Sequence, residues 1–148
     1  MSKAEVFCAK IGFVVLHNLL ASGYPGRVFA TNREGVDVLG ITTVPDIDDL
    51  PDGEIDLVVV CTPASANLAL LRSCAAKGIK AAFLTSAGYA EAGEAGAADQ
   101  QELVALGDEL GMLIAGPNGQ GVVSTPASLC AQMVAPFPPR GHIGVASQ

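Results

Sequence analysis

The chain has 148 residues, half of them apolar, and a formal net charge of −7. This length suits one domain with a substantial hydrophobic core. The negative charge argues against nonspecific binding to nucleic acid, although helix N-termini and loop amides can still hold a phosphorylated small molecule. The chain has no apolar run of membrane-spanning length, and its first residues lack a signal-peptide pattern. We therefore expect a cytoplasmic protein that binds neither nucleic acid nor membrane.

The first half of the chain predicts one helix and several short extended segments. A helix is expected from Ile11 to Ser22, because this apolar stretch is followed by Gly23, a common helix stop. A short strand over residues 27–32 follows a Tyr-Pro-Gly turn. A brief strand over 41–46 and a single helical turn over 46–52 come next.

The second half alternates strands and helices. Its clearest strand is IDLVVVCTP, whose continuous apolar centre is typical of a parallel strand buried on both faces. Such alternation predicts an α/β, Rossmann-like, doubly wound and mostly parallel sheet with helices on both faces. Beyond Pro117 the chain reads as loop-rich. The expected elements are a strand over 55–63, a helix over 64–78, a strand over 79–86, a helix from about 97 to 110, a strand over 112–116 and a final strand over 142–147.

The sequence predicts two parts of very different size. Residues 1–133 form the α/β domain, and residues 134–148 are a proline-rich linker and the start of a following domain. The four cysteines have no Cys-X-X-Cys spacing, which makes a zinc site improbable, and Cys61 and Cys74 are expected as buried free thiols.

Ligands of open parallel sheets bind at the C-terminal ends of the strands. Small residues, hydroxyls and free amides gather at these ends, which suits the close approach of a ligand rather than acid–base catalysis. The four stretches at strand ends are Thr31-Asn32-Arg33, Cys61-Thr62-Pro63-Ala64, Thr85-Ser86-Ala87-Gly88 and Gly116-Pro117-Asn118-Gly119-Gln120-Gly121.

Candidate catalytic and metal-binding groups are few, so we predict neither a catalytic nor a metal site. His17 and His142 have no neighbouring acid in the sequence, and Ser86 lacks the Gly-X-Ser-X-Gly context of a nucleophile. An acidic cluster reads as a solvated loop rather than as a metal site. Its members are Asp46, Asp48, Asp49 and Asp52.

The segment GPNGQG has two interpretations. It resembles a phosphate cradle without the Lys-Ser/Thr pair of a P-loop, and it also fits a tight turn after a strand. A Pro-Asn-Gly turn would expose the amide of Asn118 at the strand end. Arg33 either reaches a phosphate or is an ordinary surface arginine.

The motifs follow one another in a familiar order: NLLASGYPGRVFATN, DLPDGEIDLVVVCTPA, KGIKAAFLTSAGYAEAGEAG, LIAGPNGQGV and PPRGHIGVASQ. Together they resemble the N-terminal CoA-binding domain of the NDP-forming acyl-CoA synthetases. These are the ADP-forming acetate–CoA ligases and the related succinyl-CoA ligase alpha subunit. The likeness runs from about Ile11 to Gln148. It implies a Rossmann-like module that holds the ADP portion of coenzyme A or acyl-CoA and works with the remaining ligase domains or subunits.

The resemblance also implies which residues bind the cofactor. Most lie in loops after strands, and two lie at the N-terminus of the first helix, where a phosphate is expected. The loop before the long helix is matched by Thr62 and Pro63, a Ser-Ala-Gly loop by Ser86, Ala87 and Gly88, and the asparagine of a Gly-Pro-Asn motif by Asn118. A loop near the CoA phosphates is matched more loosely by Asn32 and Arg33. The helix start carries Lys10 and Gly12.

Two departures from the family pattern concern the site. Gly119 stands where family members usually carry cysteine or serine, so a side chain is missing beside the ligand. The Gly-Ala-Ser-type loop of the family is also absent ahead of Lys10. Residues 4–8 therefore form either a shortened central strand or a replacement for a lost start.

The catalytic parts of the family lie elsewhere, by the same resemblance. A phosphohistidine belongs to a second domain and nucleotide hydrolysis to an ATP-grasp domain. Neither His17 nor His142 matches the phosphohistidine, so this chain alone is not expected to complete a ligase reaction. Whether it takes part in an enzyme is left open.

Two alternatives to a CoA-binding module remain. One is a Rossmann domain that binds or senses NAD(H), against which stands the lack of a Gly-X-Gly-X-X-Gly motif. The other is a scaffold that binds no ligand because its first loop is shortened. A sheet without its central strand would leave edges unpaired, so we expect a homo-oligomer.

Overall fold

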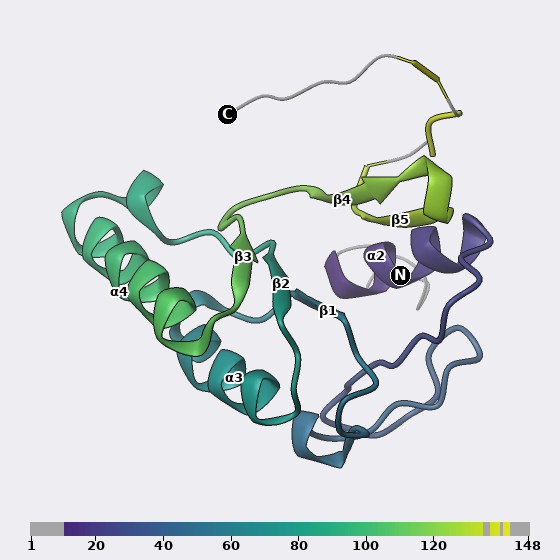
Figure 1. Cartoon of the computed structure of the whole chain (residues 1–148), viewed down its shortest axis with the longest axis horizontal. Coiled ribbons are helices and arrows are strands. Elements are labelled where there is room, and N and C mark those ends of the chain that lie inside the picture. The colour runs from purple at the N-terminus through teal and green to yellow at the C-terminus, as the bar shows by residue number, and fades with distance from the viewer. Residues whose placement is uncertain (1–10, 135–136, 140, 143–148) are drawn as a thin grey trace, which may run out of the picture.

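The structure is a computed structural model that describes residues 11–134, 137–139 and 141–142 (Figure 1). Three expectations lie outside the described residues: the strand over 4–8, the position of Lys10 and most of the final strand over 142–147.

A parallel sheet of three strands forms the centre of the fold. Its strands are β1 (Leu57–Val60), β2 (Ala81–Leu84) and β3 (Leu113–Ala115), side by side in that order. The first residues of the three strands lie opposite one another in register. All three strands were predicted, although each is shorter than its apolar run.

Two helices connect the three strands. They are α3 (Ala64–Ala76) and α4 (Glu94–Leu110), and α4 begins earlier than the predicted start near residue 97. Each ends at a glycine with positive φ, at +85° for Gly78 and +58° for Gly111, as the sequence predicted. Figure 1 shows α3 and α4 on one side of the sheet, and α2 (Ile11–Ala21) on the other.

The region after residue 117, predicted to be loop-rich, contains an antiparallel hairpin instead. Its strands are β4 (Gly121–Ser124) and β5 (Leu129–Gln132), joined by the short 3-10 helix η3 (Thr125–Ala127). The prediction failed because the two strands lack the continuous apolar run that marks β1, and a proline lies between them.

The hairpin covers α2, which it contacts mainly through β5 (Figure 1). Two polar side chains of α2 donate hydrogen bonds to hairpin carbonyls. Asn18 Nδ2 lies 2.8 Å from the Gln132 oxygen, and Ser22 Oγ lies 2.7 Å from the Ser128 oxygen. The first described helix and the last described strand therefore form one packed unit.

The segment between α2 and β1 is mostly irregular. The predicted strand over 27–32 is reduced to one isolated parallel bridge, between Thr31 and Val44. The expected helical turn is present as the 3-10 helix η1 (Ile47–Asp49). Asp46 accepts from the Asp48 amide and Asp49 from the Asp46 amide, so the acidic cluster caps this turn.

One hydrophobic core lies between the sheet and helices α3 and α4. The fully buried side chains include Val60, Leu71, Ile79, Leu84 and Leu103. A mostly parallel, Rossmann-like α/β fold was predicted and is confirmed. Among the described residues, no helix is both long and apolar enough to cross a membrane.

Candidate functional site

The three loops that follow the parallel strands meet at one edge of the sheet. Ser86 Oγ donates to the Thr62 carbonyl at 2.6 Å, which joins the loop after β2 to the loop after β1. The backbone amide of Asn118 donates to the Ser86 carbonyl at 2.9 Å, which joins the loop after β3 to the loop after β2. Hydrogen bonds thus connect Thr62, Ser86 and Asn118, predicted from separate motifs, in one continuous surface.

Asn67, in the first turns of α3, is the residue that sequence reasoning missed. It is 0% exposed, and its side chain makes three hydrogen bonds. Its Oδ1 accepts from the Thr62 hydroxyl at 2.8 Å, and its Nδ2 donates to Ser86 Oγ at 3.1 Å and to the Tyr89 hydroxyl at 2.8 Å. A signal was available, because Asn67 shares the buried face of α3 with Leu71 and Cys74 at helical spacing.

These bonds decide what the hydroxyls can offer a ligand. A serine or threonine hydroxyl has one proton to donate. The Thr62 hydroxyl gives its proton to Asn67, and the Ser86 hydroxyl gives its proton to the Thr62 carbonyl. Neither hydroxyl therefore has a donor left for a phosphate oxygen.

Between Ser86 and Tyr89 lie Ala87 and Gly88, both exposed. Gly88 has φ +104°, a conformation that a side chain would strain. The amides of Gly88 and Tyr89 donate to Glu91 Oε1 at 2.6 and 3.3 Å. The hydrogen bond from Gly88, the larger of these effects, lowers the pKa of the Glu91 carboxyl below its usual range. Glu91 therefore supplies an anion to this loop.

The Gly116–Gly121 segment forms the third loop. Asn118 is exposed and has φ +55°, the left-handed conformation that asparagine tolerates better than most residues. The Gly119 amide donates to the Leu84 carbonyl at 3.2 Å, which holds the turn against the end of β2. The segment therefore forms a tight turn after a strand and also presents Asn118 at the site edge.

The start of α2 reaches the same edge beside β1. A Cβ added to Gly12 would lie 3.6 Å from the Cβ of Cys61, in ordinary contact. Cys61 is exposed, so the prediction that it is buried was wrong, because the residue lies just beyond the last residue of β1 rather than within the strand. Cys74, in α3, is buried as predicted.

Asn32 and Arg33 form a separate turn. Asn32 Oδ1 accepts from the Glu34 amide at 3.1 Å, and Arg33 is exposed. Within the described ranges, no hydrogen bond or ion pair joins this turn to the loops after β1, β2 and β3. Pro63, in contrast, directly precedes α3 in the loop that contains Thr62.

Catalytic groups do not gather at this edge in the part of the chain that the structure describes. His17 and His142 are both exposed, and His17 pairs only with its neighbour Asn18, at 3.3 Å. The described residues include no cluster of three or more histidine, cysteine or acidic side chains suited to a metal ion.

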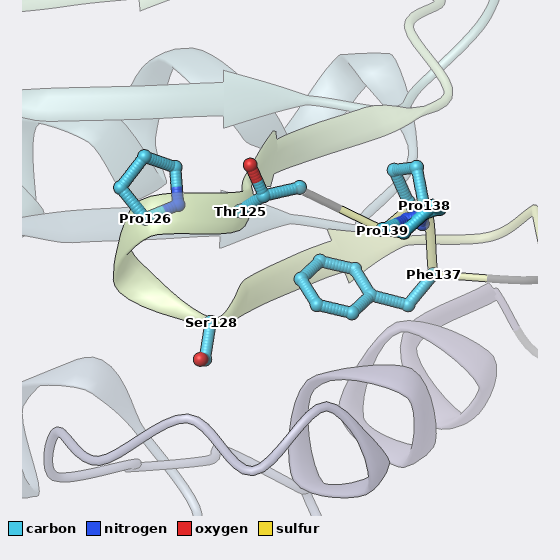
Figure 2. A pocket seen from close by; sticks show the side chains of 6 residues that line it. All are labelled: Thr125, Pro126, Ser128, Phe137, Pro138 and Pro139. Carbon is cyan, nitrogen blue, oxygen red and sulfur yellow. The ribbon is translucent and has the colours of Figure 1, made fainter. Parts of the chain in front are cut away.

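A cavity of about 360 Å³ lies beside the hairpin rather than at the strand ends. Figure 2 shows the side chains that line it, and none of them is a predicted site residue. This first cavity is lined by Thr125, Pro126, Ser128, Phe137, Pro138 and Pro139. A second hollow of about 340 Å³ lies along α4.

Comparisons with known proteins identify the family of this chain. A family described as the CoA binding domain matches residues 8–125. The ADP-forming acetate–CoA ligase I subunit alpha of Pyrococcus furiosus is 36% identical over 126 residues, covering 82% of this chain and 27% of that protein. The ADP-forming acetate–CoA ligase II of Archaeoglobus fulgidus is 32% identical over 140 residues, covering 94% of this chain and 21% of that protein.

A solved structure agrees. The dinucleotide-forming acetyl-coenzyme A synthetase 1 of Candidatus Korarchaeum cryptofilum, in complex with phosphate and ADP, is 32% identical with a TM-score of 0.79. The match covers 90% of this chain and 27% of that chain. This chain thus spans between about a fifth and just over a quarter of the length of these relatives.

Proposed function

Since this chain belongs to the CoA-binding domain family, we propose that it holds the ADP portion of coenzyme A at the C-terminal ends of β1, β2 and β3. The observation that carries the proposal is the hydrogen-bonded junction of three loops at that edge, all of them within the family match. Parallel sheets bind their ligands at this edge.

The proposed binding groups are mainly backbone and small side chains. Because the Thr62 and Ser86 hydroxyls are engaged with neighbouring groups, we propose that these residues shape the loops and contact the ligand through backbone. Ala87 and Gly88 leave room for the ligand to approach, and Asn118 offers an exposed amide. Pro63 would form the adjacent wall.

The phosphates would lie toward the start of α2. Gly12 is beside Cys61 at the edge of the site, and a helix N-terminus attracts anions. Lys10 would add a positive charge next to this helix. Asn32 and Arg33 are proposed as more distant contacts, because Arg33 is exposed and free to extend toward a phosphate.

The larger assembly is also part of the proposal. The relatives are ligases several times longer than this chain, so we propose that the chain presents coenzyme A to further ligase domains or subunits. In that arrangement residues 1–133 are the binding domain, and residues 134–148 lead toward the next domain. Self-association of the chain remains an expectation.

Calorimetric titration of the purified chain with coenzyme A, acetyl-CoA and NADH tests the proposal. We expect micromolar binding of coenzyme A and acetyl-CoA with no response to NADH. Binding of NADH alone would favour a dinucleotide sensor. No binding signal with any of the three ligands would favour a scaffold that binds no ligand.

A further inference from the structure

Asn67 is the only described side chain that hydrogen-bonds to both the loop after β1 and the loop after β2. It accepts from Thr62 in the first loop and donates to Ser86 and Tyr89 at the two ends of the second. Ala87 and Gly88, the exposed residues of the second loop, therefore lie between two points that Asn67 fixes.

Burial makes this arrangement stiff. Asn67 is 0% exposed and Tyr89 is 2% exposed, so neither polar group can exchange its partner for water. A buried polar group that loses its partner destabilises the fold, because its desolvation is then uncompensated. Among the described residues, every buried side-chain nitrogen or oxygen has a hydrogen-bond partner. Any displacement of the loop would break at least one of these bonds without a substitute.

The two central residues of the second loop contribute little to its shape through their own side chains, although Ser86 also bonds to the Thr62 carbonyl and to the Asn118 backbone amide. Ala87 carries a methyl group and Gly88 only a hydrogen, and Gly88 adopts a positive φ that glycine tolerates. The Glu91 carboxylate holds the Gly88 and Tyr89 amides from the exposed side, while Asn67 holds the loop from the buried side. The buried contacts are the ones that solvent cannot replace.

We propose that Asn67, through its bonds to Thr62, Ser86 and Tyr89, is a positioning residue that holds the loops after β1 and β2 in the shape that receives coenzyme A. The inference rests on the proposed function, because it names the residue on which that same site depends. Asn67 itself does not touch the ligand, since it is fully buried behind the loop.

Two variants separate positioning from simple stability. Asn67→Leu keeps a similar volume but removes all three hydrogen bonds, and Tyr89→Phe removes one hydroxyl while keeping the ring. Leu103→Ala is the control, because Leu103 is a 1% exposed core residue of α4 that makes no contact with the loop network by hydrogen bonding. Coenzyme A affinity is measured by calorimetry at a temperature where circular dichroism shows every variant folded.

We expect Asn67→Leu to weaken coenzyme A binding about ten-fold and Tyr89→Phe about three-fold. Leu103→Ala should destabilise the fold yet keep its affinity within about two-fold. Tyr89→Phe should have no further effect on affinity in the Asn67→Leu background, because the bond it removes is already lost. Equal affinities in folded wild type and variants would overturn the inference, and so would an equal loss of affinity in Leu103→Ala.

Hydrogen exchange of the ligand-free protein distinguishes this failure from failure of the proposed function. Asn67→Leu and Tyr89→Phe should speed exchange at the Gly88 and Tyr89 amides more than exchange in β2. Unchanged loop exchange would overturn the positioning role whatever the ligand. A wild type that does not bind coenzyme A, together with faster loop exchange in the variants, would overturn the proposed function and leave Asn67 as an organiser of a loop with another role. Tyr89→Phe keeps the test decisive if Asn67→Leu fails to fold.

Discussion

The ring of Phe83 fills the space that a side chain at position 119 would need. Phe83 belongs to the middle strand β2 and is 7% exposed, and a Cβ added to Gly119 would overlap its ring. Gly119 does not have the positive φ that would itself favour glycine. The ring alone thus accounts for glycine at a position where the family pattern leads one to expect cysteine or serine.

Substitution at this contact should be costly and should depend on its partner. We expect Gly119→Ser to lower the free energy of unfolding by about 1–3 kcal/mol, because the ring must shift in a packed core. In a Phe83→Leu background the cost should be smaller, since leucine leaves room for the hydroxymethyl group. Chemical denaturation measures both values.

Gly141→Ser is the matched control, because a Cβ there meets nothing within 4 Å. It should change the free energy of unfolding by less than about 0.5 kcal/mol. Strictly additive effects of Gly119→Ser and Phe83→Leu would show that the two positions do not compete for one space.

We expect the contribution of Glu91 to the stability of the protein to depend on pH. Its folded pKa lies below the ordinary value of 4.5, chiefly because of the Gly88 amide. A group with a lowered folded pKa stabilises the protein above its unfolded pKa, and this contribution is lost as the pH falls through the folded value. Glu91→Gln should therefore unfold at a lower temperature than wild type at neutral pH, and the difference should vanish in acid.

Thermal unfolding from neutral pH to about pH 3 checks this prediction. Glu109, whose pKa is lowered by Arg72, also titrates in this range, so only the difference between wild type and Glu91→Gln isolates Glu91. A difference that stays constant down to the lowest pH would mean that the charge of Glu91 does not support the loop.

At Asn118, the contribution of the side-chain amide to ligand binding can be measured separately from the effect of backbone strain on stability. At φ +55° glycine is relaxed, whereas alanine is strained by roughly 1–2 kcal/mol. Asn118→Gly should weaken coenzyme A binding by about 1–3 kcal/mol, the value of a lost polar contact, with little loss of stability. Asn118→Ala should show the same loss of affinity together with lower stability. Unchanged calorimetric affinity in both variants would remove the amide from the site.

Cys61 reports on occupancy of the strand ends. It is exposed beside Gly12, whereas Cys74 and Cys130 are buried. Desolvation raises the pKa of the Cys61 thiol above its ordinary 9.0, with a hydrogen bond to Thr85 opposing it, and burial raises the pKa of Cys74 to about 11. Among the three cysteines that the structure describes, iodoacetamide should therefore label Cys61 first, at a rate that still rises above pH 9.

Saturating coenzyme A should slow the labelling of Cys61, as measured by mass spectrometry of its peptide. Cys130 is the internal control, because it is 1% exposed in strand β5 of the hairpin and reports unfolding. A rate at Cys61 that coenzyme A leaves unchanged would place the ligand away from the end of β1.

The parts of the fold that were predictable are those with local signals. The run LVVV identified β1, and Gly78 and Gly111 marked the ends of α3 and α4. The hairpin was missed because β5 packs on α2 and β4 pairs with β5, so its stability depends on a contact between distant parts of the chain. The strand expected over 27–32 has the right composition, yet only Thr31 forms a bridge.

The site was predictable in its location but not in its hydrogen bonding. Motif order and strand ends indicated Thr62, Ser86 and Asn118. No local pattern shows that the Thr62 and Ser86 hydroxyls face inward, because their partner, Asn67, lies on another element. In the sequence, such a partner can be recognised as an asparagine at a helical position that is otherwise occupied by buried apolar residues.

The contact between α2 and β5 also bears on where this domain can be cut. The family match ends at residue 125, after β4 but before β5 begins at Leu129. A polypeptide that stopped there would lose Cys130 and Ala131, each 1% exposed, and both hairpin carbonyls that α2 bonds. The side of α2 that packs on the hairpin would then be exposed to water. The shortest piece of this chain able to fold should therefore extend at least to Gln132.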